Sequence, residues 1–174
     1  MKKTFIIALC CMALSFAACK PDNPTPNGPV DDVDYTEKYV GNYIGDFDLT
    51  IATINNEAVT PTPTFPVPSI GMVITKGDAD NVITATVTID DVTRQTTGKA
   101  SANKADFDAV NLLIDKPDQG YTVELKLKME GSISEDGALV IEGNFTEGHG
   151  VIVYGQANPF DEASGTISGK LVKQ

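Results

Sequence analysis

A strict alternation of apolar and polar side chains, with a period of two residues, constrains the fold of this chain more than any other feature. The alternation is clearest over 121–130. Its apolar positions are Tyr121, Val123, Leu125, Leu127 and Met129. Because successive side chains of a β-strand point to opposite faces, such a segment buries one face and leaves the other in water. One wet face per strand is typical of antiparallel sheets.

The same period recurs from Tyr39 to the end of the chain. We expect strands over 43–51, 69–76, 83–89, 95–103, 107–115, 121–130, 139–145, 150–157 and 167–171. The links include hairpin-type turns at 76–78, 117–120 and 135–137, where Gly or Asp tolerates a positive φ. The pattern predicts an all-β fold, an antiparallel meander that closes as a barrel of about eight strands, with a β-sandwich as the alternative. Closure is favoured because it removes unpaired strand edges.

A proline-rich segment, Ala58–Pro68, interrupts this rhythm. Its prolines cannot donate to a strand ladder, so the segment is predicted to be a long loop with polyproline II character. Two interpretations remain open. The loop is either a rigid surface connection or a lid over the mouth of the barrel, with Phe65 as its apolar tip.

The N-terminus has the pattern of a secretory signal. Met1-Lys2-Lys3 is positively charged, and the apolar run Thr4–Ala17 is shorter than the about 20 residues that span a bilayer. Small residues follow, so a signal peptide over 1–18 is expected to be removed. Residues 19–38 hold several prolines and few apolar side chains, which predicts a flexible tether. A single domain over 39–174 follows, of a size typical for one domain.

The tetrapeptide Phe16-Ala17-Ala18-Cys19 resembles a bacterial lipobox. That resemblance implies cleavage before Cys19 and lipid, including palmitate, on this residue. The protein would then be a lipoprotein anchored in the outer membrane, facing either the periplasm or the cell exterior. The other cysteines, Cys10 and Cys11, lie inside the signal, so the mature domain has no disulfide and no thiolate metal site.

The chain is strongly acidic. Its formal charge is −11, and loss of Lys2 and Lys3 with the signal makes it −13. Such a protein repels nucleic acid and anionic membrane surfaces. The charge serves either solubility at the cell surface or recognition of a cationic partner.

Short glycine-containing motifs resemble those of calycin-like (lipocalin-like) lipoproteins of Gram-negative bacteria. The segment 39–45 is similar to their opening strand, 131–139 to their hairpins, and 165–169 to their closing strand. The resemblance implies a barrel over 39–174. It also implies that the loop after the first strand lies at the open mouth.

Few residues suit catalysis. His149 is the single histidine and lies in Glu147-Gly148-His149-Gly150, which predicts an exposed turn. No P-loop, Gly-x-Gly-x-x-Gly or Gly-x-Ser-x-Gly motif is present. Pairs of acids at 46/48, 90/91 and 106/108, and the 78–81 segment, are expected on solvated faces and turns. We therefore expect no enzyme activity, no metal and no cofactor.

The apolar face remains as the candidate binding surface. The large side chains expected inside the barrel are Tyr43, Phe47, Leu125, Met129, Ile141 and Phe145. Small inward residues (Gly45, Ala85, Gly143 and Gly169) leave room either for packing or for one small ligand. The sequence thus predicts a non-enzymatic, lipid-anchored binding protein of the cell envelope. Its partner is a small apolar ligand, covered by Phe65, or a surface protein. The alternative is a structural or adhesive subunit of a surface assembly.

Overall fold

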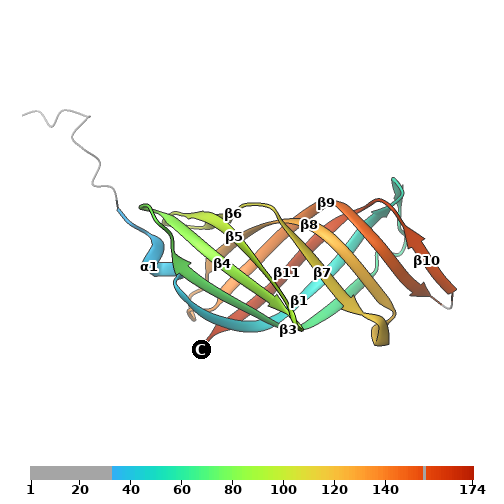
Figure 1. The fold of residues 1–174 in the computed structure, drawn as a ribbon, viewed down its shortest axis with the longest axis horizontal. Coiled ribbons are helices and arrows are strands. Elements are labelled where there is room, and N and C mark those ends of the chain that lie inside the picture. Colours follow the sequence, from blue (N-terminus) through green and yellow to red (C-terminus); the bar gives the residue numbers. More distant parts are fainter. Residues whose placement is uncertain (1–32, 155) are drawn as a thin grey trace, which may run out of the picture. The chain divides into compact units, whose positions relative to one another are not determined.

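A computed structural model describes residues 33–154 and 156–174 and shows a closed antiparallel barrel of eight strands (Figure 1). Around the ring the order is β1 (Gly41–Ile54), β3 (Thr64–Lys76), β4 (Val82–Ile89), β5 (Val92–Ala100), β6 (Ala105–Phe107), β8 (Tyr121–Ile133), β9 (Leu139–Tyr154) and β11 (Ala163–Lys173). Pairing of β11 with β1 closes the ring. The predicted all-β barrel is confirmed, and the sandwich alternative is wrong.

Shorter elements complete the wall. The strand β2 (Glu57–Ala58) pairs with the end of β1, β7 (Val110–Lys116) pairs with the first half of β8, and β10 (Gln156–Phe160) pairs with the end of β9. The 3₁₀ turn η1 (Pro117–Gln119) links β7 to β8. Gly120 and Gly137 adopt φ values of 84° and 80°, as the predicted turns at these positions require.

A single helical turn, α1 (Thr36–Tyr39), lies at one end of the barrel, and β10 lies at the other (Figure 1). We call these the N-terminal end and the distal end. Tyr39 is buried and donates to the Ser101 carbonyl at 3.0 Å, and Tyr43 donates to the Tyr39 carbonyl at 2.8 Å. Residues 34–38, assigned to the tether from the sequence, therefore belong to a segment that contacts the barrel. No helix in the described ranges is long and apolar enough to cross a membrane.

Three interior phenylalanines stand directly opposite glycines on the neighbouring strand. The pairs are Phe47 with Gly169, Phe107 with Gly98, and Phe145 with Gly165. A Cβ atom added to Gly169 would lie 2.3 Å from the Phe47 ring, closer than atoms can approach. Each phenylalanine ring thus packs on the backbone of the opposite strand, at a position where any side chain larger than glycine would clash. Packing of aromatic rings on strand glycines helps a sheet to curve and close into a barrel.

The strand β3 begins at Thr64, so the predicted loop over Ala58–Pro68 is wrong in its second half. Pairing of β3 with β4 starts only at Ile70, and 64–68 therefore has β1 as its one neighbouring strand among those described. The Pro66 carbonyl accepts a hydrogen bond from the Tyr121 hydroxyl at 2.7 Å. Pro66 lies on this edge, and Pro68 lies in the β-bulge of the pairing with β1, two kinds of position where a strand tolerates a missing N–H.

A second difference concerns His149. The structure runs β9 without a break through Glu147-Gly148-His149-Gly150, where the sequence predicted an exposed turn. The two glycines face close neighbours instead of forming a turn. A Cβ on Gly150 would lie 2.1 Å from the Thr122 carbonyl oxygen on β8.

Candidate functional site

The interior residues named from the sequence meet in one apolar cluster. Tyr43, Phe47, Leu125, Met129, Ile141 and Phe145 are each at most 2% exposed. Phe65 does not sit at a loop tip but on β3, where it is 9% exposed and its ring centroid lies 4.7 Å from that of Tyr121. The structure brings these side chains together as core, and a ligand among them stays a prediction.

Side chains of the protein occupy the space beside the small inward residues. A Cβ on Gly45 would lie 2.9 Å from Leu171 Cδ2, and one on Gly143 would lie 2.9 Å from Ile167 Cγ2. The place beside Gly169 is taken by Phe47. This arrangement favours a filled interior over a hollow one and directs attention to the outer wall.

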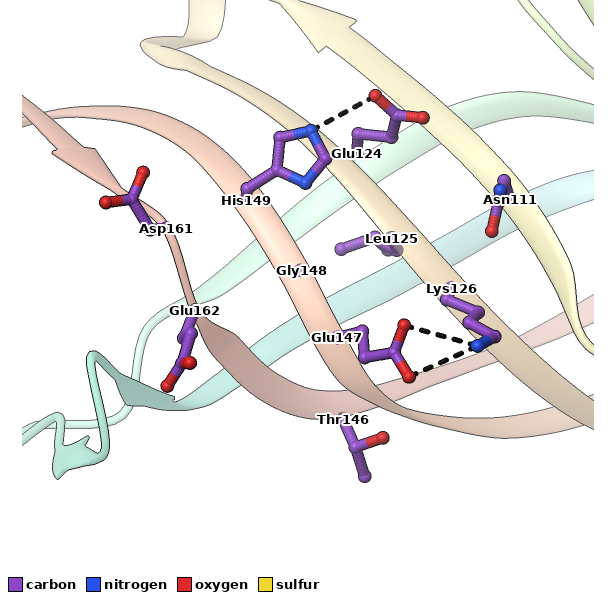
Figure 2. Close-up of a pocket in the computed structure, with 10 residues that line it drawn as sticks. All are labelled: Asn111, Glu124, Leu125, Lys126, Thr146, Glu147, Gly148, His149, Asp161 and Glu162. Carbon is purple, nitrogen blue, oxygen red and sulfur yellow. Dashed lines mark hydrogen bonds and ion pairs between the residues drawn. The ribbon is translucent and has the colours of Figure 1, made fainter.

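The outer wall has a hollow of about 400 Å³ along β8 and β9, which we call the β8–β9 groove (Figure 2). It is lined by Asn111, Glu124, Leu125, Lys126, Thr146, Glu147, Gly148, His149, Asp161 and Glu162. Gly148 stands opposite Leu125, and a Cβ on it would lie 3.3 Å from the Ala163 carbonyl oxygen and from the Phe145 ring. Asn111 comes from β7, and the two last acids come from the turn between β10 and β11.

Two cross-strand contacts bridge the groove, an ion pair of Lys126 with Glu147 and a contact of His149 with Glu124 that is an ion pair only when the histidine is protonated (Figure 2). His149 Nε2 lies 3.2 Å from Glu124 Oε2, and Lys126 Nζ lies 3.2 Å from both carboxylate oxygens of Glu147. All four side chains are about half exposed or more. Exposed pairs of this kind contribute only about 0–1 kcal/mol to stability. A binding partner can therefore replace these contacts with contacts of its own at little cost in free energy.

The acidic rim of the groove is held by two asparagines with positive φ. Asn55 and Asn56 have φ of 49° and 64° and form the turn between β1 and β2. The Asn55 side-chain oxygen accepts from the N–H groups of Asp161 and Glu162 at 3.3 and 3.4 Å. Asn56 Nδ2 donates to the Glu162 carboxylate at 2.6 Å. The rim is thus positioned by hydrogen bonds from another hairpin.

The groove is electronegative. Four carboxylates, from Glu124, Glu147, Asp161 and Glu162, face one lysine when His149 is neutral. No group of acids, histidines or cysteines suited to hold a metal occurs among the described residues. The arrangement can bind cationic or hydrogen-bonding groups at the surface.

The acid pairs singled out in the sequence lie elsewhere on the wall and in the turns. Asp46 accepts from the Ser69 N–H at 2.9 Å, and Asp90 pairs with Lys116. Lys104 lies 2.9 Å from Asp106 and lowers the pKa of that carboxyl. Asp108 accepts from Thr97. Asp106 and Asp108 both line a hollow of about 310 Å³ on the outer wall, together with Lys99 and Lys128.

The groove was not predicted from the sequence. Its residues come from three strands and a turn, and their meeting depends on the cross-strand register. A β-bulge at Thr146 places Glu147 opposite Lys126 and Phe145 opposite Leu127. The one available signal was the alternating charge along 124–130. The signal peptide, Cys19 and most of the tether lie outside the described residues.

Comparisons with known proteins identify no family. No family model and no curated protein sequence matches the chain. Among solved structures, the sensor domain of PknI from M. tuberculosis matches with a TM-score of 0.36 and 13% identity, over 75% of this chain and 86% of that one. A protein of unknown function from the DUF3598 family of Nostoc punctiforme matches with a TM-score of 0.32 and 12% identity. That match covers 78% of this chain and 48% of the other.

Proposed function

We propose that this chain is a non-enzymatic binding protein of the bacterial cell envelope, held on the outer membrane by lipid on Cys19. Its binding surface is the β8–β9 groove, and its partner is a cationic surface protein or peptide. One observation carries the choice of surface: the space beside the inward glycines is filled by the protein's own side chains. The groove, by contrast, is open, polar and electronegative.

The groove suits reversible recognition. Its carboxylates are exposed, so a partner that carries lysine or arginine can reach them without unfolding the wall. Charge complementarity of this kind speeds association and selects partners by the sign of their charge. A strongly acidic chain also rejects nucleic acid, which fits a protein-binding role.

A lysine-rich peptide is a suitable probe for the groove. The double variant Glu124→Gln with Glu147→Gln should weaken binding in calorimetry and flatten its salt dependence, because two of the groove carboxylates lose their charge. The matched control is Glu130→Gln with Glu142→Gln. Those two acids face each other on the same strands outside the groove. Equal weakening by both pairs would show that only net charge matters and would reject the groove as the site.

The anchor is tested separately. Replacing Cys19 with Ala should move the protein from the membrane fraction to the soluble fraction. Retention of the variant on membranes would contradict the lipid anchor, whatever the groove binds.

The interior ligand is a second candidate for the bound molecule. Contact of Phe65 with Tyr121 supports it, because both rings belong to the buried apolar cluster that such a ligand would contact. Uptake of an apolar fluorescent probe by the intact protein, reduced in Phe65→Ala, would support an interior site. Absence of uptake would leave the groove as the binding surface.

A structural or adhesive role in a surface assembly is the other candidate function. The strand β10 pairs with β9 on one side and with no described strand on the other. Such an edge can accept a strand from another chain. Copurification of a stable stoichiometric assembly from membranes, lost when 155–160 is replaced by a tight turn, would favour this role.

A further inference from the structure

Exposed aliphatic side chains gather toward the N-terminal end of the barrel. In the described part of the chain, the large apolar residues left exposed are Val33, Ile44, Val73 and Val172, at 51, 51, 41 and 57%. Ile44 stands opposite Val172 on β11 and opposite Gly71 on β3, and Val73 is two residues beyond Gly71. We call Ile44, Val73 and Val172 the aliphatic patch. It lies where β1 begins and where β3 and β11 end.

The outward neighbours of the patch toward β3 and β4 are uncharged. Asn42 stands opposite Val73, Thr86 stands opposite Val73 on the other side, and Thr88 stands opposite Gly71. Along β1 and β11 the next outward residues are Asp46 and Lys170, which stand opposite each other.

Lysines lie around this end of the barrel: Lys38, Lys76, Lys99, Lys104, Lys170 and Lys173. Acids lie beside them, and Lys76 pairs with Asp34, Lys104 with Asp106 and Glu130, and Lys170 with Asp136. Aliphatic side chains beside lysines, whose apolar stems can lie along lipid while the ammonium stays in water, suit the headgroup level of a bilayer.

The turns of the distal half are more acidic than those of the N-terminal end. Asp90, Asp91, Asp115, Asp118, Asp161 and Glu162 lie in or beside them. A membrane with anionic lipids repels such a surface. At the end that carries the patch, lysines offset most of the acids, and this end is the less acidic of the two.

The described chain begins at this same end. Asp34 accepts from Lys76 and from the Thr36 N–H at 3.0 Å, which ties the start of the domain to the turn after β3. From there back to Cys19 the chain can span roughly 50 Å at most. A lipid on Cys19 thus keeps the patch within reach of the membrane surface at a high effective concentration.

We propose that the aliphatic patch rests on the lipid headgroups of the membrane that holds the anchor. This contact fixes the orientation of the barrel, with its N-terminal end on the membrane and the acidic distal end facing away. This inference rests on the proposed lipid anchor, and it identifies the face of the barrel that contacts the lipid surface.

Single thiols allow a direct test, because the mature chain has no cysteine besides Cys19. The acylated full protein, carrying Val73→Cys or Val172→Cys, is labelled with an environment-sensitive fluorophore and inserted into vesicles of phosphatidylethanolamine and phosphatidylglycerol. Asp118→Cys, exposed in η1 at the distal end and outside the groove, is the matched control. Headgroup-attached nitroxide lipids should quench the labels at 73 and 172 several-fold more than the label at 118.

The outcomes separate the two proposals. Flotation of the protein with vesicles together with equal quenching at all three positions would overturn the membrane contact and leave the anchor intact. Loss of flotation would overturn both. Oxidative cross-linking of Val73→Cys between copies, without quenching, would show that a second copy covers the patch and would also overturn the lipid contact.

Discussion

Two walls of this barrel share the same kind of interior and differ completely outside. The outward side chains of β3, β4 and β5 form a threonine wall, with Thr75, Thr84, Thr86, Thr88, Thr93, Gln95 and Thr97. The outward side chains of β8 and β9 form a charged wall, with Glu124, Lys126, Lys128, Glu130, Glu142, Glu147 and His149. Both walls bury mainly apolar residues, interrupted on β5 by Thr96, whose hydroxyl donates to the Asp108 carbonyl at 2.8 Å. The interior is thus constrained by packing, while the exterior is free to carry charge, and the groove lies on the charged wall.

The largest expected effect tests whether the inward residues alone hold the charged wall. Leu125→Ala should lower the free energy of unfolding by about 2–5 kcal/mol, because Leu125 is 1% exposed within the core. Its neighbour Lys126→Ala should change it by about 0.5 kcal/mol or less. Denaturant unfolding followed by far-ultraviolet circular dichroism measures both. Equal costs would mean that the ion pairs of this wall contribute as much as its core.

The same alternation explains how much of the fold the sequence could predict. Most strands expected from the period of two exist, because burial of one face fixes which side chains point inward. Two expectations about where strands divide are wrong: 139–154 is one strand, β9, and 107–115 is divided between β6 and β7. The prolines at 66 and 68 indicate a loop where β3 begins, although they occupy an edge with one neighbouring strand. His149 was placed in a turn because its flanking glycines fit a turn as well as a close strand contact. Without knowing the neighbouring strand, a proline-containing edge strand cannot be told from a loop, and a glycine in close strand contact cannot be told from a glycine in a turn.

The functional surfaces were less accessible to prediction than the core. The interior residues followed directly from the alternation, and the structure buries all of them. The groove depends on a bulge at Thr146 and on the turn held by Asn55 and Asn56, which are long-range features of register. Lipidation of Cys19 stays a prediction, because this residue lies outside the described ranges.

The next prediction concerns the aromatic and glycine pairs that curve the sheet. Gly169→Ala should destabilise the fold by about 1–3 kcal/mol, because the new methyl group overlaps the Phe47 ring and the Asp46 carbonyl. Gly71→Ala is the control on β3, since a Cβ there meets its nearest atom, on Thr88, at 3.7 Å. Thermal unfolding should separate the two variants. Similar melting temperatures would indicate that the barrel relaxes around position 169.

A smaller effect is expected where the charged wall meets the open edge of β3. Tyr121→Phe removes the hydroxyl that donates to the Pro66 carbonyl and should cost about 0.5–1.5 kcal/mol. The ring and its contact with Phe65 remain. Faster amide exchange confined to 64–68 would locate the loss at this edge. Unchanged exchange there would mean that β1 alone holds the segment.

The smallest expected change in stability concerns Asp34, at the N-terminal end of the barrel, and it depends on pH. The Lys76 ammonium, the Thr36 N–H and the Asn81 N–H hold the pKa of the Asp34 carboxyl well below its ordinary value near 3.8. Because the pKa is depressed in the folded state, this stabilisation is fully present above the ordinary pKa and is lost as the pH falls toward the folded value. The melting temperature of the native protein should therefore exceed that of Asp34→Asn near neutral pH, and the difference should shrink below about pH 4. The control is Asp78→Asn, in the turn that also contains Asn81. The difference in melting temperature between this variant and the native protein should not shrink in acid. A difference between native protein and Asp34→Asn that stays constant into acid would show that the hydrogen-bonding shape of the side chain, and not its charge, ties α1 to the threonine wall.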